Sequence, residues 1–136
     1  MSTEKSTKRT ILVADDDIDD QTMISGSMYE LDQDCLVEMV TDGQQAINRL
    51  ENTSLPQPCL VVLDLNMPIL NGMETLTRIR QNPSLQGIPV VVFTTSDSKE
   101  YRKQSLTLGA MDYIVKPNDY GGLMEVTAKM MLYCKA

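Results

Sequence analysis

The sequence predicts an α/β protein with a five-stranded parallel sheet and helices on both faces. Short β-branched and apolar runs alternate with longer segments of helical spacing from one end of the chain to the other. Four of these runs each end in a polar residue, namely Asp15, Asp64, Thr94 and Lys116. The carboxyl ends of parallel strands share one edge of a sheet, where ligands bind in open α/β folds. We therefore expect a single functional site at that edge.

Each element is expected from a local pattern. Asn71-Gly72 opens one helix, Asn82-Pro83 ends it, and Gly109 follows another helix as a C-terminal glycine. The helix at 98–108 is nearly all polar, so we expect it to be loosely held, with Tyr101 and Leu108 as its core anchors. Strands are expected near 10–15, 35–40, 59–64, 89–94 and 112–116, and helices near 18–31, 43–52, 72–81, 98–108 and 119–134.

The length and the hydropathy pattern indicate one domain with no membrane segment. The 136 residues suit a single core, and we expect a disordered tail at 1–9 and one domain at 10–136, without an output domain. No apolar run approaches the roughly 20 residues that span a bilayer, and the polar first ten residues do not resemble a secretory signal. The expected location is the cytoplasm.

Cysteine and histidine usage narrow the chemistry. Cys35, Cys59 and Cys134 are widely spaced and odd in number, so we expect reduced thiols, with Cys59 buried. The chain has no histidine, which removes the commonest general base and the usual zinc ligand. A metal would have to be held by oxygen ligands, which points to Mg²⁺, Mn²⁺ or Ca²⁺.

The net charge of −7 is unevenly distributed. Residues 11–98 carry fourteen acids against three arginines, a balance of −11, whereas residues 99–136 carry six basic residues against four acids, a balance of +2. Direct binding to nucleic acid is not expected, since it requires a basic surface. Asp17, Asp19 and Asp20, at the start of the first helix, are expected chiefly to complement the helix dipole.

Four segments together resemble the receiver domain of the two-component response-regulator family. They are ILVADDD at 11–17, VVLDLNMPILNGME at 61–74, VVVFTTS at 90–96 and GAMDYIVKP at 109–117, and the match covers residues 10–134. The resemblance implies a (βα)5 flavodoxin-like receiver fold. The segment at 82–96 further resembles stand-alone receivers paired with phytochrome-like or hybrid sensor kinases.

The resemblance also implies a role for each polar residue of the expected site. Asp64 would accept a phosphoryl group, and Lys116 and Thr94 would stabilise charge on its oxygens. Mg²⁺, for which Mn²⁺ could substitute, would be held by Asp15, Asp16, Asp64 and the backbone carbonyl of Asn66. Thr94 and Tyr113 would act as switch residues, and Asn66 and Ser96 would tune the lifetime of the phosphate. Pro68, Gly72 and Pro117 would shape the loops, and the bond before Pro117 would be cis.

The expected function is that of a signalling switch. Its phosphoryl donor would be a sensor histidine kinase or a histidine phosphotransfer protein. The 98–134 surface would contact a downstream protein or, in a homodimer, a second copy of the chain. Its local charge of +2 would attract an acidic partner, and the loosely held helix at 98–108 would let the surface change on phosphorylation. One alternative is a Mg²⁺-dependent phosphohydrolase of the haloacid-dehalogenase type, but Asn66 stands where that class needs a second aspartate. A flavin-binding module is another, but one Phe and no Trp offer little to a flavin ring.

Overall fold

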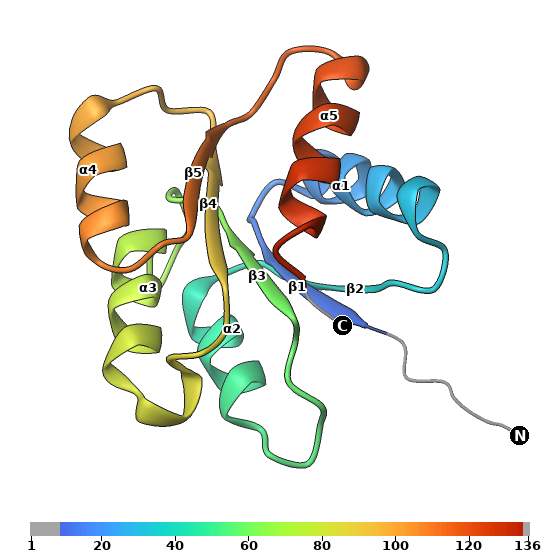
Figure 1. Cartoon of the computed structure of the whole chain (residues 1–136). Coiled ribbons are helices and arrows are strands. Elements are labelled where there is room, and N and C mark those ends of the chain that lie inside the picture. Colours follow the sequence, from blue (N-terminus) through green and yellow to red (C-terminus); the bar gives the residue numbers. More distant parts are fainter. Residues whose placement is uncertain (1–8, 135–136) are drawn as a thin grey trace, which may run out of the picture.

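The computed structural model describes residues 9–134 and contains one parallel sheet of five strands (Figure 1). The strand order is β2-β1-β3-β4-β5, so the first strand lies inside the sheet and the chain reverses its direction of winding there. The residues of β1, β3 and β4 are all buried, as their continuous apolar sequences predict for central parallel strands. The strands are β1 (Thr10–Ala14), β2 (Leu36–Val40), β3 (Leu60–Leu63), β4 (Val90–Thr94) and β5 (Asp112–Val115).

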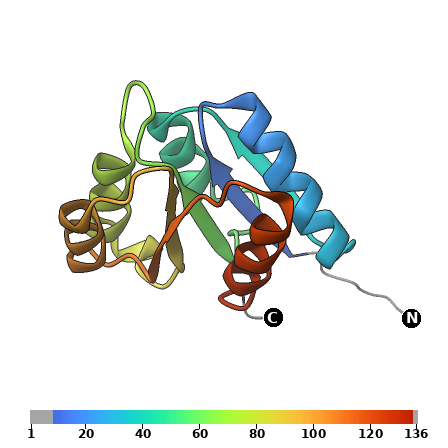
Figure 2. The same ribbon diagram turned by 90° about the horizontal axis from the view of Figure 1, so that it is seen from above.

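Five α-helices connect the strands and cover both faces of the sheet, which confirms the predicted fold class. α1 and α5 lie on one face and α2, α3 and α4 on the other (Figures 1 and 2). A short 3₁₀ turn, η2 (Pro83–Leu85), was not predicted and places Leu85 in the core. The helices are α1 (Ile18–Leu31), α2 (Gly43–Glu51), α3 (Gly72–Gln81), α4 (Lys99–Thr107) and α5 (Tyr120–Met131).

Each of the five α-helices begins at a polar cap. The side chains of the capping residues accept hydrogen bonds from free backbone N–H groups in the first turn, which explains why the helices start close to their predicted positions. Asn71 and Glu74 form a reciprocal capping box at the start of α3. The caps of the five helices in chain order are Asp17, Asp42, Asn71, Ser98 and Asp119.

Alternate residues of the strands divide the core into two layers. Ile11, Val62 and Phe93 point to the face covered by α1 and α5, whereas Leu12 and Leu63 point to the opposite face. Between α1 and α5 the apolar contact is joined by one buried polar pair, in which the hydroxyl groups of Ser27 and Thr127 lie 3.0 Å apart. This hydrogen bond fixes how the two helices lie against each other.

The anchors expected for the polar helix α4 were partly wrong. Tyr101 is 46% exposed, and Leu108, just after the helix, is only partly buried against the core. The one buried residue within α4 is Ser105, whose hydroxyl donates to the carbonyl of Tyr101 and contacts Met73 Sδ at 3.6 Å. The contact of α4 with Met73 of α3 is thus made by a small polar side chain, and the helix packs without large apolar anchors.

The expectation of three reduced thiols was wrong. Cys59 and Cys134 form a disulfide with a Cα–Cα distance of 4.8 Å, and only Cys35 is a free thiol. Cys59, expected to be buried, is partly exposed. The pairing joins the residue before β3 to the turn after α5 across 75 positions, so no local sequence pattern could indicate it.

The expected tail, 1–9, falls mostly outside the described residues, which start at Arg9. Arg9 contacts the folded domain: its guanidinium pairs with Asp32 at 2.5 Å and donates to the carbonyl of Cys134 at 3.0 Å. Among the residues that the structure describes, no helix is both long enough and apolar enough to cross a membrane.

Gly72 occupies a position where no side chain fits. A Cβ atom built there would lie 2.4 Å from the carbonyl oxygen of Asp64 and 2.8 Å from Cα of Leu65. Both neighbours are backbone atoms, which cannot move aside without displacing the end of β3. The glycine therefore permits α3 to start directly beneath the loop that carries Asp64.

We expect Gly72→Ala to lower the free energy of unfolding by about 2 kcal/mol, because the added methyl group overlaps backbone atoms. Urea denaturation followed by circular dichroism measures this change. Gly26→Ala is the matched control: a Cβ at Gly26 meets nothing within 4 Å, so alanine should stabilise α1 by up to about 1 kcal/mol. Equal stability of Gly72→Ala and the native protein would contradict the close approach.

Candidate functional site

Three carboxylates meet at the carboxyl edge of the sheet, as the sequence predicts. β1 and β3 are neighbours in register, so Asp15 and Asp16 at the end of β1 lie beside Asp64 at the end of β3. One oxygen from each of the three carboxylates lies within 4.8 Å of the other two. Asp15 and Asp64 are buried, whereas Asp16 is exposed, so the cluster opens to solvent on one side only.

Lys116 reaches this cluster from the end of β5. Its Nζ lies 2.7 Å from Asp15 Oδ2, 2.7 Å from Asp20 Oδ2 and 3.1 Å from Asp64 Oδ2. Burial by itself lowers the pKa of the ammonium, but the hydrogen bonds to Asp15 and Asp20 and the charge of Asp64 outweigh it and raise the pKa above its ordinary value. Lys116 is therefore charged under all ordinary conditions.

Asp15 is the most enclosed carboxylate of the cluster. Burial raises the pKa of its carboxyl group above the ordinary value, and the hydrogen bonds from Lys116 and from the Asp17 N–H only partly oppose this effect. A cation added to the cluster would favour the charged form of this carboxyl group.

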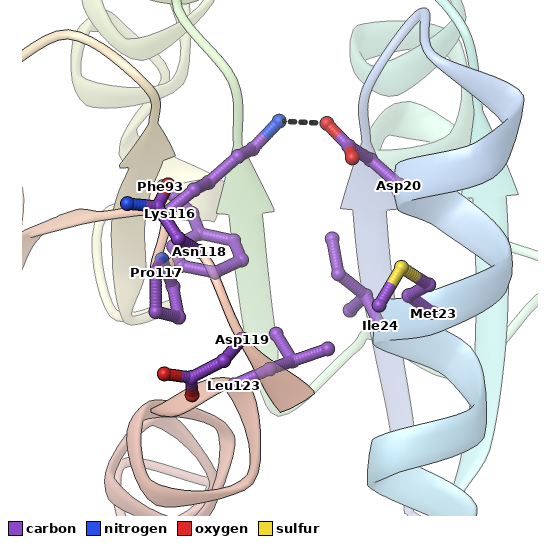
Figure 3. Close-up of a pocket in the computed structure, with 9 residues that line it drawn as sticks. All are labelled: Asp20, Met23, Ile24, Phe93, Lys116, Pro117, Asn118, Asp119 and Leu123. Carbon is purple, nitrogen blue, oxygen red and sulfur yellow. Dashed lines mark hydrogen bonds and ion pairs between the residues drawn. The ribbon is translucent and has the colours of Figure 1, made fainter. Parts of the chain in front are cut away.

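Asp20 has a role that the sequence analysis missed. It was assigned to the helix dipole, but its carboxylate pairs with Lys116 across the space between α1 and β5 (Figure 3). Asp17 does act as the helix cap, accepting from the N–H groups of Asp19 and Asp20. The available signal was the spacing: Asp20 lies four positions before Ile24, on the same inward side of α1.

Gln21 is a second residue that the sequence analysis missed. Its side-chain amide donates to the carbonyl of Asp15 at 2.7 Å and to that of Val40 at 2.9 Å. It thereby ties α1 to the ends of β1 and β2 and fixes the backbone that presents Asp15. The available signal was the spacing, because Gln21 lies three positions before Ile24 and seven before Met28, on the helix face that is buried.

Thr94, Ser96 and Tyr113 form a connected polar chain next to the site. Thr94 is fully buried at the end of β4, and its carbonyl accepts from the Lys116 N–H at 2.7 Å. Thr94 Oγ1 accepts from the Ser96 N–H at 3.3 Å, and the Tyr113 hydroxyl donates to the Ser96 carbonyl at 2.7 Å. Burial, the largest influence, raises the pKa of this hydroxyl above its ordinary value.

Arg102 of α4 contacts both the ring and the backbone of Tyr113. Its guanidinium carbon lies 4.8 Å from the centre of the Tyr113 ring, and Nη1 donates to the Tyr113 carbonyl at 3.0 Å. Because Thr94, Ser96 and Tyr113 are linked, Arg102 connects the surface helix α4 to the edge of the carboxylate site. No sequence pattern indicated this contact.

The loop between β3 and α3 frames the site. The Asn66 N–H lies 3.4 Å from Asp64 Oδ1, the carbonyl of Pro68 accepts from the Leu70 N–H at 2.7 Å, and Ile69 has a positive φ of 69°. The Lys116–Pro117 bond, expected to be cis, is trans, the isomer that X–Pro bonds adopt in most folded proteins.

Two cavities flank the carboxylate cluster. One of about 290 Å³ lies between α1 and the start of α5, with Lys116 and Asp20 at its rim and Ile24 and Leu123 in its wall (Figure 3). The other, of about 520 Å³, is bounded by Asp16, Asn66 and Tyr101. Asp16 of the three-carboxylate cluster lines the second cavity, whereas the first is lined by none of the three, so a large group would reach them from the side of Asp16.

The donor set at this site fits a hard divalent cation. Three carboxylates supply oxygen ligands, one of them exposed, and in the described part of the chain they are the one group of acidic, cysteine or histidine side chains close enough to share an ion. Carboxylate and carbonyl oxygens suit Mg²⁺ and Mn²⁺.

Comparison with known proteins agrees with this geometry. The family model of the response regulator receiver domain matches residues 11–128. Response regulator Rcp1 of Synechocystis sp. is 32% identical over 130 residues, which cover 93% of this chain and 88% of Rcp1. A protein-glutamate methylesterase of Syntrophomonas wolfei is also 32% identical over 130 residues, but the match spans only 35% of that protein.

Two solved structures extend the comparison. The phosphorylated cyanobacterial phytochrome response regulator RcpA has a TM-score of 0.86 at 28% identity and covers 94% of each chain. The Mn²⁺-bound form of Rcp1 has a TM-score of 0.81 at 31% identity, covering 90% of this chain and 91% of that one. These findings support divalent metal binding at the acidic cluster and give no support to the phosphohydrolase alternative.

We expect Lys116→Gln to raise the affinity for Mn²⁺ roughly tenfold, about 1.4 kcal/mol, because it removes a positive charge within 3.1 Å of two buried carboxylates. Electron paramagnetic resonance of free Mn²⁺ measures the affinity. Lys129→Gln, which removes an exposed lysine paired with Asp112, should leave it unchanged. Unchanged binding in Lys116→Gln would show that the ion binds elsewhere.

Proposed function

Because the chain belongs to the response regulator receiver domain family, we propose that Asp64 accepts a phosphoryl group from a sensor histidine kinase or a histidine phosphotransfer protein. The observation that carries the proposal is the position of Asp64 at the end of a central strand, hydrogen-bonded to Lys116 within the three-carboxylate cluster. Receiver domains work with sensor histidine kinases, and the protein is a switch of this kind.

The chemistry is an in-line transfer. A carboxylate oxygen of Asp64 attacks the phosphorus atom, the bond to the histidine nitrogen of the donor breaks, and an acyl phosphate forms. Lys116 and the hydroxyl of Thr94 stabilise the negative charge that spreads over the phosphoryl oxygens. For this step Lys116 exchanges part of its pairing with Asp20, the most exposed of its three partners, for the phosphoryl group.

We assign the resident metal as Mg²⁺, for which Mn²⁺ can substitute. Asp15, Asp16, Asp64 and the backbone carbonyl of Asn66 would hold it. Bound there, the ion would neutralise the acidic cluster and offset charge on the transferring group. The chain itself promotes both the phosphorylation of Asp64 and the hydrolysis of its acyl phosphate. Asn66, whose N–H lies 3.4 Å from Asp64 Oδ1, and Ser96 would position the attacking water and tune the lifetime of the phosphate.

The switch runs from Thr94 to the surface of α4. When the hydroxyl of Thr94 turns to the phosphoryl group, it leaves the Ser96 N–H, 3.3 Å away. The same Ser96 accepts the Tyr113 hydroxyl, and Arg102 holds the Tyr113 ring. Phosphorylation thus shifts the equilibrium between two arrangements of these contacts. They lie next to α4, a helix with a single buried residue, so α4 can move with them.

The partner surface spans residues 98–134. It carries the exposed apolar side chains of Tyr101, Leu106 and Met111, and a downstream protein or a second copy of the chain would dock on it. We further propose that the protein acts in the cytoplasm, where a sensor histidine kinase would present the phosphorylated histidine.

We expect Asp64→Asn to abolish the uptake of acid-labile phosphate from acetyl phosphate with Mg²⁺, because the amide is a poor nucleophile. Phosphate incorporation and intact mass measure it. Asp34→Asn, at an exposed aspartate, is the control and should take up one stable equivalent. Wild-type uptake by Asp64→Asn would refute the acceptor, and continuous release of phosphate by the native protein without accumulation of a phosphorylated form would indicate a hydrolase.

We expect a phosphoryl mimic, beryllium fluoride with Mg²⁺, to change amide hydrogen exchange across 94–120 and leave β1 unchanged. Arg102→Gln should raise exchange in the same segment without the mimic, because Tyr113 loses the cation above its ring. Arg78→Gln, on α3, is the control. Unchanged protection across 94–120 in the mimic-bound protein would contradict the proposed partner surface.

A further inference from the structure

The Cys59–Cys134 disulfide lies at the opposite end of the sheet from the carboxylate cluster. The Cys59 N–H donates to the Thr10 carbonyl at 2.8 Å immediately before β3 starts, whereas Asp64 follows the other end of that strand. The disulfide ties the turn after α5 to the amino-terminal edge of the sheet. Nothing in the phosphoryl chemistry uses this pair.

A cavity of about 640 Å³ opens beside the disulfide. Cys59 lines it, and the side chains of Ile88, Pro89, Met111 and Tyr133 form its walls. Cys59 is partly exposed, whereas Cys134 is only 4% exposed. A reagent that enters the cavity therefore meets the sulfur of Cys59 and finds that of Cys134 shielded. The volume suits a ligand as large as a tripeptide.

Arg9 contacts the backbone of the shielded cysteine. Its Nη1 donates to the carbonyl of Cys134 at 3.0 Å, while the same guanidinium pairs with Asp32 at 2.5 Å. This contact reaches the carbonyl and not the sulfur, so it holds Cys134 in place. The direction of attack therefore follows from exposure, because Cys59 lines the cavity and Cys134 is shielded.

We propose that this cavity is a thiol-exchange site for a low-molecular-weight thiol. The thiolate attacks Cys59 Sγ, a mixed disulfide forms, and the bond to Cys134 breaks; Cys134 leaves as a thiolate and takes a proton from water. A second thiol attacks the sulfur of the first thiol in the mixed disulfide and releases Cys59, which is also protonated. Two electrons thus pass from two small thiols to the protein, and the small-molecule disulfide is the product and, in reverse, the oxidant.

Exchange would loosen the turn after α5 while leaving the domain folded. Tyr133 donates to Asp112 at 2.9 Å, Arg9 donates to the Cys134 carbonyl, and Met131, Tyr133 and Cys134 pack against the core, and none of these contacts needs the S–S bond. Reduction would remove only the covalent cross-link, so these non-covalent contacts would then hold the segment 131–134. The redox state of the pair would therefore set how firmly the end of the chain is fixed to the sheet.

The test uses glutathione and its disulfide as probes, with peptide mapping by mass spectrometry. We expect the native protein in excess glutathione disulfide to contain the Cys59–Cys134 bond, and Cys134→Ser to carry a glutathionyl group on Cys59. Cys35→Ser should behave as the native protein, because Cys35 is buried and unpaired. Free Cys59 and Cys134 thiols in the oxidised native protein, or no adduct at Cys59 in Cys134→Ser, would overturn the proposal.

The role of the cavity has its own test. Gly87 lines it, and a Cβ there meets nothing within 4 Å, so leucine would occupy cavity space without a backbone clash. We expect Gly87→Leu to slow glutathionylation of Cys59, in the Cys134→Ser background, roughly tenfold. Gly26→Leu, at the other open glycine, should not change the rate. Equal rates in the two variants would overturn the cavity as the route to Cys59.

Discussion

The Lys116 ammonium holds together an edge of the sheet that would otherwise repel itself. Its three carboxylate partners come from the end of β1, the first turn of α1 and the end of β3. Two of them, Asp15 and Asp64, are buried, where an unpaired charge is costly. One cation therefore links four elements of the fold. The same charge that stabilises the resting edge is the one that a phosphoryl group would meet, so stability and chemistry share a residue.

The sequence predicted those features of the fold that depend on local pattern or on the ends of strands. Apolar runs located the five strands, and caps such as Asp17 and Asn71 located the helix starts. Parallel strands have their carboxyl ends at one edge of the sheet, so the sequence alone predicts that Asp15, Asp64 and Lys116 lie close together. The roles of individual residues in phosphoryl transfer stay predictions.

The missed features all depend on contacts between distant segments. Asp20 and Gln21 sit on a helix face whose neighbour is fixed only when α1 packs on the sheet. Cys59 and Cys134 form a disulfide because the start of β3 lies beside the end of α5. Arg102 contacts the Tyr113 ring because α4 packs on the domain without large apolar side chains. Tyr101 was misjudged because an aromatic residue usually signals a core position, whereas here Ser105 makes the close contact.

The buried Ser27–Thr127 hydrogen bond has a mechanical consequence. A directional bond between hydroxyl groups in an apolar contact resists both sliding and rotation of α5 on α1. Any shift leaves the buried Thr127 hydroxyl without this partner, although Ser27 keeps its bond to the Ile24 carbonyl. α1 and α5 therefore behave as one rigid frame on their face of the sheet. The switch proposed at Thr94 would therefore act through α4, which has a single buried residue, and not by moving α5 on α1.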